Sequence, residues 1–264
     1  MANCVRRGRA TVALAIALGV SELPGIPGSG IAVAQDIFLE GTRDNWRWTI
    51  TPYLWGSDIE TDVRFPGGQE IGGTARFNDI LDKLEIGGMV HFEGRRDAWG
   101  MFVDATYLAL SDDTTHGPFT ADSELDAGLY EFAATYTPGG ASGAFTAYAG
   151  ARIVDLSLEM TFSGPGPMGP IRRTSDKSFT DFMVGARFVH PFNDRWLLDL
   201  QGDIGGGDTE SSWNALALVG WKFGGDLDTA VLFGWRHMEF EVEESGRETD
   251  VTFDGPIAGV LFSF

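Results

Sequence analysis

Hydrophobic and polar side chains alternate with a period of two along most of this 264-residue chain. In one segment, Phe145, Ala147 and Ile153 share one face, whereas Thr146 and Arg152 share the other. This alternation is typical of β-strands, because successive side chains of a strand point to opposite faces. Clusters of Gly, Pro, Asp and Asn separate the alternating segments, which predict ten strands: residues 46–63, 84–93, 98–110, 125–136, 145–158, 179–189, 196–204, 213–223, 229–240 and 251–264.

The predicted fold class is all-β, as a closed, transmembrane, antiparallel up-and-down β-barrel. A water-soluble sandwich would bury the apolar faces, whereas a membrane barrel turns them to lipid and lines its lumen with the polar faces. The segments reach the ~9–11 residues that a membrane-spanning strand needs. Trp and Tyr gather at segment ends, as an interfacial girdle requires. We predict ten strands, with twelve as the alternative if residues 59–65 and 74–77 form another spanning hairpin.

Two local features leave open questions about the barrel. Residues 77–84 have helix-like apolar spacing, which fits either a turn of helix at or in the barrel mouth or an irregular loop anchored by its apolar residues. Pro52 and Pro256 stand in the first and last strands, which must pair at the seam of a closed barrel. Because proline cannot donate to a ladder, each predicts a bulge or a weakened ladder there.

Residues 1–34 are predicted to be a cleaved signal peptide. Arg6, Arg7 and Arg9 precede a short apolar run at residues 10–20, and an A-x-A cleavage pattern occupies residues 32–34. Residues 35–45 would then be a periplasmic tail, and residues 46–264 the barrel. The only cysteine is Cys4, so the mature chain would carry no thiol chemistry. We expect export to the outer membrane of a Gram-negative bacterium.

The connections between the predicted strands alternate in length. Short ones at residues 94–97, 137–144, 190–195 and 224–228 are expected on the periplasmic side. Longer and more polar ones are expected outside, at residues 64–83, 111–124, 161–178, 205–212 and 241–250. The formal net charge of −19 argues against binding nucleic acid through its phosphates. Expected partners are outer-membrane lipid and lipopolysaccharide, with divalent cations at the acidic loops as an open alternative.

The last predicted strand has an amphipathic pattern that places Val260, Phe262 and Phe264 on one face. This pattern resembles the closing strand of outer-membrane barrels, which the barrel-assembly machinery recognises. Three further motifs, at residues 46–55, 77–84 and 91–104, resemble a family of small, porin-like proteobacterial outer-membrane barrel proteins. The resemblance implies the fold and the location, and it supplies no catalytic residues.

The polar faces of the predicted strands carry charges of both signs. A small barrel must fill its lumen with side chains, and buried charges persist by pairing and hydrogen bonding. We interpret these residues as a structural salt-bridge network that largely packs the lumen, with a narrow path for small solutes or ions as the alternative. The predicted lumen set is Arg47, Glu85, His91, Glu93, Asp104, Glu131, Arg152, Asp181, Arg187, Asp199, Asp203, Lys222 and Arg236.

We expect no enzymatic activity, because no spacing specifies a catalytic site. A barrel protease or lipid A-modifying enzyme is the least favoured alternative, and its candidate rim residues would be Asp112, Asp113, His116, Asp208 and His237. No cofactor or metal site is predicted. Oxygen ligands that suit calcium or magnesium do occur in the acidic stretches 122–126 and 241–244, but without EF-hand spacing.

Overall fold

The computed structural model describes residues 45–116, 119–140, 143–164, 170–223, 229–244 and 246–264. The predicted signal peptide and all but the last residue of the predicted tail lie outside these residues. The described elements are β1 (Arg47–Trp55), β2 (Asp58–Arg64), β3 (Glu70–Ala75), α2 (Phe77–Asp82), β4 (Leu84–Arg96), β5 (Trp99–His116), β6 (Phe119–Tyr136), β7 (Phe145–Ser163), β8 (Ile171–Pro191), β9 (Trp196–Gly207), β10 (Ser211–Phe223), β11 (Thr229–Glu244) and β12 (Arg247–Ser263).

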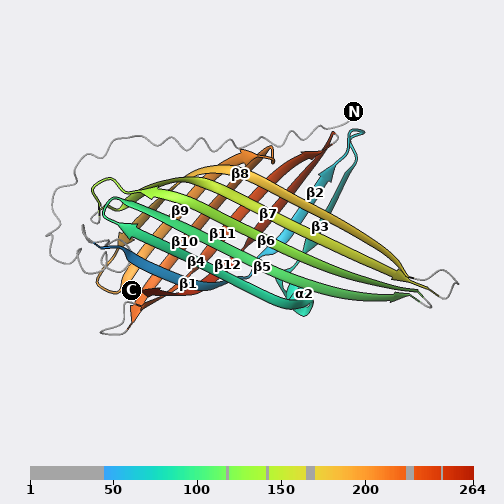
Figure 1. The fold of residues 1–264 in the computed structure, drawn as a ribbon, viewed down its shortest axis with the longest axis horizontal. Coiled ribbons are helices and arrows are strands. Elements are labelled where there is room, and N and C mark those ends of the chain that lie inside the picture. Colours follow the sequence, from blue (N-terminus) through green and yellow to red (C-terminus); the bar gives the residue numbers. More distant parts are fainter. Residues whose placement is uncertain (1–44, 117–118, 141–142, 165–169, 224–228, 245) are drawn as a thin grey trace, which may run out of the picture.

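The strands form one antiparallel sheet that closes on itself where β1 pairs with β12 (Figure 1). β2 continues β1, because both pair with β12 in the same register: Leu54 lies opposite Ala258, and Asp58 lies opposite Asp254. β3 pairs with β2 only. The wall of the barrel therefore has ten strands, which confirms the predicted fold class and strand number. The described part of the chain contains no helix long and apolar enough to cross a membrane.

The strands on one side of the barrel are much longer than predicted, and several predicted loops are wrong. β5 and β6 stay paired as far as His116 opposite Phe119, and β7 and β8 as far as Phe162 opposite Ile171. Figure 1 shows β5 to β8 extending together beyond the rest of the barrel. The error arose because the alternation continues there in Ser, Thr and Asp, which sequence reasoning took for loop residues.

The chain between β1 and β4 combines a hairpin and a helix, so the first predicted strand, residues 46–63, is divided between β1 and β2. β2 and β3 form the hairpin, and α2 follows it, with Ile80 buried and Asp79 in its first turn. The helical interpretation of residues 77–84 is therefore the correct one. Phe77 donates its backbone N–H to Asp58 Oδ1 at 2.8 Å, which ties the start of α2 to the start of β2.

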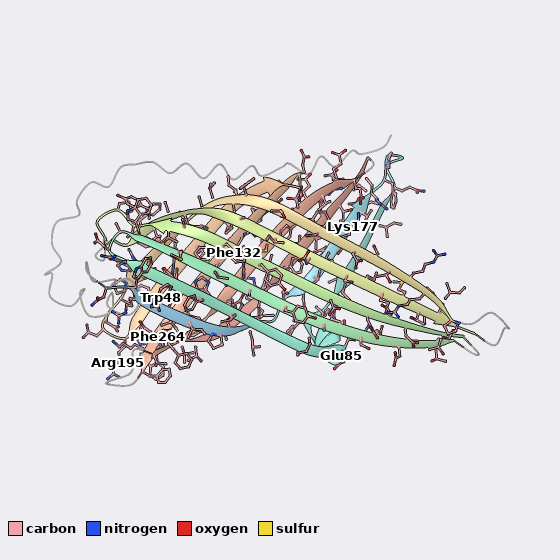
Figure 2. All side chains as sticks on the ribbon, viewed as in Figure 1. Trp48, Glu85, Phe132, Lys177, Arg195 and Phe264 are labelled. Atoms are coloured by element: carbon pink, nitrogen blue, oxygen red, sulfur yellow. The ribbon has the colours of Figure 1, made fainter. Side chains whose placement is uncertain are left out.

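The outward face of the barrel carries an apolar band. Leu54 is 74 % exposed and Phe182 76 % exposed, and the neighbouring residues of the same strands, Tyr53 and Met183, are buried. Trp46 and Trp48 stack at 5.3 Å at the end where the chain enters β1, which we call the periplasmic end following the predicted orientation. Figure 2 places Trp48 and Phe264 at this same end. An outward apolar band with aromatic rings at its margin is the surface of a membrane-spanning barrel.

The seam between β1 and β12 contains no bulge, because the register is the same on both sides of Pro52. The N–H groups of Trp48 and Gly56 point to β12, so proline removes a donor on that side at position 52. The pairs with β12 pass over Thr51 and Pro52, so the ladder is weakened there, as the other alternative predicts. Further along the seam, a Cβ on Gly255 would collide with the backbone oxygen of Gly56. The two strands therefore approach at a distance that only glycine permits.

Candidate functional site

The interior of the barrel has two parts that differ in chemistry. A layer of paired charges, which we call the ionic layer, crosses the barrel and includes Glu131, Arg152 and Asp203. An apolar chamber lies between this layer and the extracellular end, and α2 contributes to its lining. The two parts meet where Phe240 and Trp55 of the chamber lie against arginines of the layer.

Arg152 on β7 is the centre of the ionic layer and has no exposed surface. Its Nε donates to Glu131 Oε1 at 2.6 Å, and its guanidinium also donates to Asp203 Oδ1 at 2.6 Å. A weaker hydrogen bond of 3.3 Å reaches Ser212 Oγ. The guanidinium carbon lies 5.8 Å from the centre of the Phe240 ring. One arginine thus joins strands β6, β7, β9 and β10 across the lumen.

Arg236 on β11 extends the layer. It donates to Glu131 Oε2 at 3.0 Å and to Asn214 Oδ1 at 3.0 Å, and its guanidinium carbon lies 4.9 Å from the centre of the Trp55 ring. Asn214 in turn donates to Asp203. Glu131 therefore accepts from two arginines at once, which compensates part of the cost of burying its charge.

A second group of contacts connects β1, β4 and β5. Asp104 Oδ1 accepts a hydrogen bond of 2.7 Å from the Tyr53 hydroxyl, and His91 Nδ1 lies 3.0 Å from Asp104 Oδ2. The Arg236 guanidinium lies 3.8 Å from Asp104, which connects this group to the rest of the layer. The other ring nitrogen of His91 lies 3.8 Å from Glu93.

The third group lies nearer the periplasmic end. Arg187 donates to both oxygens of Asp199, at 2.6 to 3.0 Å, and to Glu93 at 2.8 Å. A residual cavity of about 70 Å³ lies among these side chains. Since a water molecule takes up about 30 Å³ of the liquid, this cavity has room for only a few waters.

Asp181 belongs to the same interior but takes hydroxyl and backbone donors. It accepts from the backbone N–H of Thr209 at 3.0 Å, from the Thr209 hydroxyl at 2.6 Å and from Ser212 Oγ at 3.0 Å. The predicted lumen set contains charged residues only, so it leaves out the polar partners Tyr53, Thr209, Ser212 and Asn214, and also Tyr148, whose hydroxyl donates to Asp203 Oδ2 at 3.0 Å. The signal that could have found them is their parity, because Tyr53, Tyr148, Ser212 and Asn214 share the faces of predicted lumen charges.

Three of the predicted lumen residues lie outside these groups. Arg47 donates to Ser263 Oγ at 2.9 Å near the periplasmic end, and Lys222 lies close to the end of β10. Glu85 is exposed, which contradicts its predicted place in the lumen. The reason is an irregularity in the pairing of β4 with β5 between Leu84 and Ile86, which takes Glu85 out of the alternation.

The apolar chamber has a volume of about 410 Å³. Its side-chain lining is apolar apart from Ser57 and Thr106. It includes aromatic and aliphatic side chains of the wall and three side chains of α2: Trp55, Ile59, Met89, Leu129, Val154, Phe240 and Phe253, with Phe77, Ile80 and Leu81. The indole N–H of Trp55 is buried without a hydrogen-bond partner among the described residues.

The barrel wall is interrupted beside this chamber. Pairing of β1 with β4 runs from Arg47 opposite Arg95 to Pro52 opposite Val90 and ends there. Beyond that point, the backbone N–H of Trp55 donates to the Met89 sulfur at 3.1 Å. A thioether is a weak hydrogen-bond acceptor, so it only partly replaces the backbone carbonyl that a paired strand would offer to this N–H. We call this interruption the β1–β4 gap.

Within the described residues, the contacts seen for the candidate catalytic side chains are with residues outside the candidate set. His237 faces outward, where its Nδ1 lies 2.9 Å from Asp254 and its ring lies 4.5 Å from Trp213. The other ring nitrogen of His237 has no hydrogen-bond partner among the described residues. Asp112 pairs with Lys83 at 2.7 Å, and Asp208 accepts from the backbone of Thr180. Asp113 is exposed on β5, and the side chain of His116 lies outside the described parts.

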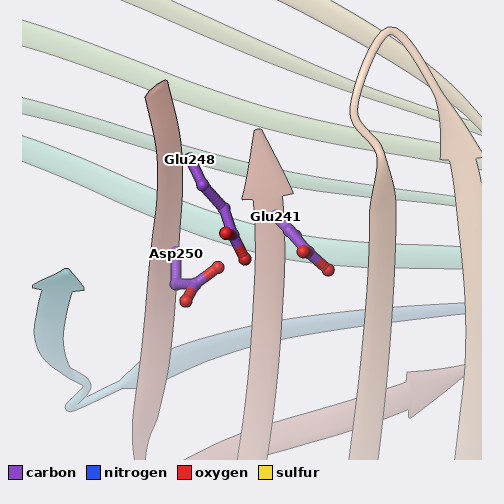
Figure 3. A group of neighbouring side chains, drawn as sticks. All are labelled: Glu241, Glu248 and Asp250. Carbon is purple, nitrogen blue, oxygen red and sulfur yellow. The ribbon is translucent and has the colours of Figure 1, made fainter. Parts of the chain in front are cut away.

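Glu241, Glu248 and Asp250 form an acidic cluster on the outer surface of β11 and β12 (Figure 3). Desolvation and the neighbouring carboxylates raise the pKa of Glu241, against a hydrogen bond from Ser211. Desolvation also raises the pKa of Asp250, although Arg64 pairs with it at 2.9 Å. Of the two predicted acidic stretches, only 241–244 contributes to this cluster, through Glu241.

Comparisons with known proteins identify similar architectures. No protein-family model matches the chain and no curated protein matches its sequence, so the family resemblance stays a prediction. The outer membrane protease OmpT of Escherichia coli is 9 % identical over 84 % of this chain and 97 % of its own, with a TM-score of 0.48. Ail, the attachment invasion locus protein of Yersinia pestis, is 8 % identical over 83 % and 99 %, with a TM-score of 0.39.

A third similar structure is the outer membrane protein OprG of Pseudomonas aeruginosa. It is 12 % identical over 83 % of this chain and 95 % of its own, with a TM-score of 0.29. Identities this low describe a shared type of fold and say nothing about activity.

Proposed function

We propose that this protein is an outer-membrane barrel whose lumen is closed by the ionic layer, with a structural or surface role. The outward apolar band and the aromatic rings at the periplasmic margin support the membrane location. The long polar strand extensions support a role at the cell surface, in contact with lipopolysaccharide. The proposal includes no catalytic activity, because the described candidate rim residues contact residues outside the candidate set and not one another.

The observation that carries the proposal is the complete burial of Arg152 between Glu131 and Asp203. A lumen that conducts ions keeps water beside its charged side chains, whereas these three side chains satisfy one another. Separating such a buried ion pair costs several kcal/mol of free energy, so the layer should stay closed when solutes are present on either side of it. The residual cavity of about 70 Å³ does not amount to a path through the layer.

Liposome swelling tests this function. Protein reconstituted into vesicles should admit no small sugar faster than protein-free vesicles do. The matched variant is Arg152→Gly with Arg236→Gly, which removes both bridging guanidinium groups and should admit the sugar if it still inserts. Rapid swelling with the wild-type protein would contradict a closed lumen and favour the narrow path for small solutes.

A further inference from the structure

The apolar chamber has the size and lining of a ligand site. Its volume of about 410 Å³ falls within the ~300–1,000 Å³ range of small-molecule pockets. Water needs several polar partners to occupy a cavity, and the chamber side chains offer almost none. The ionic layer below it takes no part in binding an apolar group, because its donors and acceptors are already paired. The chamber therefore suits an uncharged, apolar occupant.

The β1–β4 gap gives this chamber a route to the outside of the barrel. Leu54 lines the chamber and is also 74 % exposed on the outward face of β1. Gly88 of β4 lines the chamber too, and a Cβ there would meet nothing within 4 Å. A side chain that belongs both to the outer surface and to the chamber marks an opening in the wall. The opening lies where pairing of β1 with β4 has ended.

The level of the opening identifies what lies outside it. Leu54 is six residues along β1 from Trp48, which at ~3.3 Å per residue and a ~45° tilt places it about 14 Å above that girdle residue. A hydrocarbon layer is ~30 Å thick, so by this count Leu54 stands near its middle. Asp58, the first acidic residue beyond Leu54, lies opposite Asp254, which accepts from the Trp235 indole. By the same rise and tilt Asp58 is only about 9 Å beyond Leu54, so the opening lies nearer the extracellular margin and faces the acyl chains of the outer leaflet.

We propose that the chamber binds one hydrocarbon chain of an outer-leaflet lipid, which enters from the membrane through the β1–β4 gap. The chain lies between Trp55, Leu129 and Phe253, with α2 above it and the ionic layer below it. This inference rests on the membrane location in the proposed function and goes beyond it, because a closed barrel needs no lipid-accessible chamber.

Quenching of Trp55 by brominated lipid tests the inference. The protein is reconstituted into phosphatidylcholine vesicles whose acyl chains carry bromine, with unbrominated vesicles as the reference. The Trp55 signal is the difference between the wild-type protein and Trp55→Phe. This substitution is mild, because the Trp55 indole N–H has no partner to lose and phenylalanine retains a ring against Arg236. Since Trp55 is only 5 % exposed, bromine should quench most of its signal only if a chain enters the chamber.

Two further variants separate filling of the chamber from general damage. Ala127→Phe places a ring in the chamber and should abolish quenching of Trp55. Ala134→Phe, on the exposed face of the same strand, should leave it unchanged. Undiminished Trp55 fluorescence in brominated vesicles would overturn the inference, and so would quenching that Ala127→Phe leaves intact.

The outward tryptophans distinguish this failure from failure of the proposed function. Trp99 and Trp235 are 64 % and 51 % exposed on the barrel surface, and brominated lipid should quench them in any inserted barrel. If they are quenched and Trp55 is not, the membrane location stands and the chamber binds no lipid chain. If 1-bromododecane, which partitions into the bilayer, quenches Trp55 and brominated lipid does not, the chamber admits a free alkyl chain and the proposed binding of a lipid chain is wrong.

Discussion

Arg152 and Glu131 lie directly opposite each other on β7 and β6, with the arginine Nε 2.6 Å from the glutamate Oε1. The exposed fraction of each side chain is at most 4 %. The pair therefore exists only because further partners complete it: Asp203 accepts from Arg152, and Arg236 donates to Glu131. Removal of one member leaves the others charged and buried, and this makes the layer testable residue by residue.

Substitution of Arg152 by alanine should destabilise the barrel by about 3–5 kcal/mol, because Glu131 and Asp203 lose their common partner while they stay buried. Urea-induced unfolding in vesicles measures the change. The matched control is Arg172→Ala, which removes an arginine paired with Glu159 at an exposed position and should change the midpoint little. If the two substitutions changed the free energy of unfolding equally, burial of the Arg152–Glu131 pair would make no difference to stability.

The Tyr53 hydroxyl should contribute to stability through its hydrogen bond of 2.7 Å to Asp104. Tyr53→Phe removes a donor to a buried carboxylate, so a loss of about 1.5–3 kcal/mol is expected in the same unfolding assay. Tyr107→Phe is the control, because the Tyr107 hydroxyl donates to Asp126 over the same distance at an exposed site. A Tyr53→Phe protein as stable as the wild type would refute a structural role for this contact.

Gly255→Ala should weaken closure of the barrel at the seam. The new Cβ would collide with the backbone oxygen of Gly56, and backbone cannot give way as a flexible side chain does. A cost of about 1–3 kcal/mol and slower insertion into vesicles are expected. Gly73→Ala on β3, where a Cβ meets nothing within 4 Å, provides the comparison. Insertion is read from the shift in gel mobility between folded and unfolded protein.

Glu241 should contribute more to the stability of the β11–β12 hairpin in mild acid than at neutral pH. The pKa of Glu241 is raised by desolvation and by nearby carboxylates, so its stabilising contribution is complete below the unfolded-state pKa and is lost as the pH rises through the folded-state pKa. The measurement is of amide-exchange protection factors in the hairpin, compared between mild acid and neutral pH. Glu241→Gln should reduce the pH dependence. A pH dependence that Glu241→Gln leaves unchanged would contradict the assignment.

The period of two predicted the faces of the strands well, because it depends only on backbone geometry. It placed Glu131 and Arg152 in the lumen and Leu54 and Phe182 on the outside. It could not predict which charges form pairs, because the face of a strand on which a residue lies does not give its position along the barrel axis. Arg236 and Glu131 are 105 residues apart in the sequence and become partners only when the sheet closes.

The chamber escaped prediction for a different reason. The alternation predicts apolar faces outside and polar faces inside, but Leu129, Val154 and Phe240 are apolar residues on the inward face. Near the extracellular end the inward face is itself apolar, so the polarity of a residue no longer shows which face of the strand it lies on. The β1–β4 gap was likewise invisible, because it depends on where two strands stop pairing.

Single-channel recording in planar lipid bilayers tests the closed lumen most directly. The wild-type protein should insert, as shown by the gel-mobility shift of the reconstituted material, and yet give no steady unitary current at any voltage the bilayer tolerates. Steady, uniform current steps from the wild-type protein would contradict the account, because ions could pass only if the contacts of Arg152 with Glu131 and Asp203 were open to water.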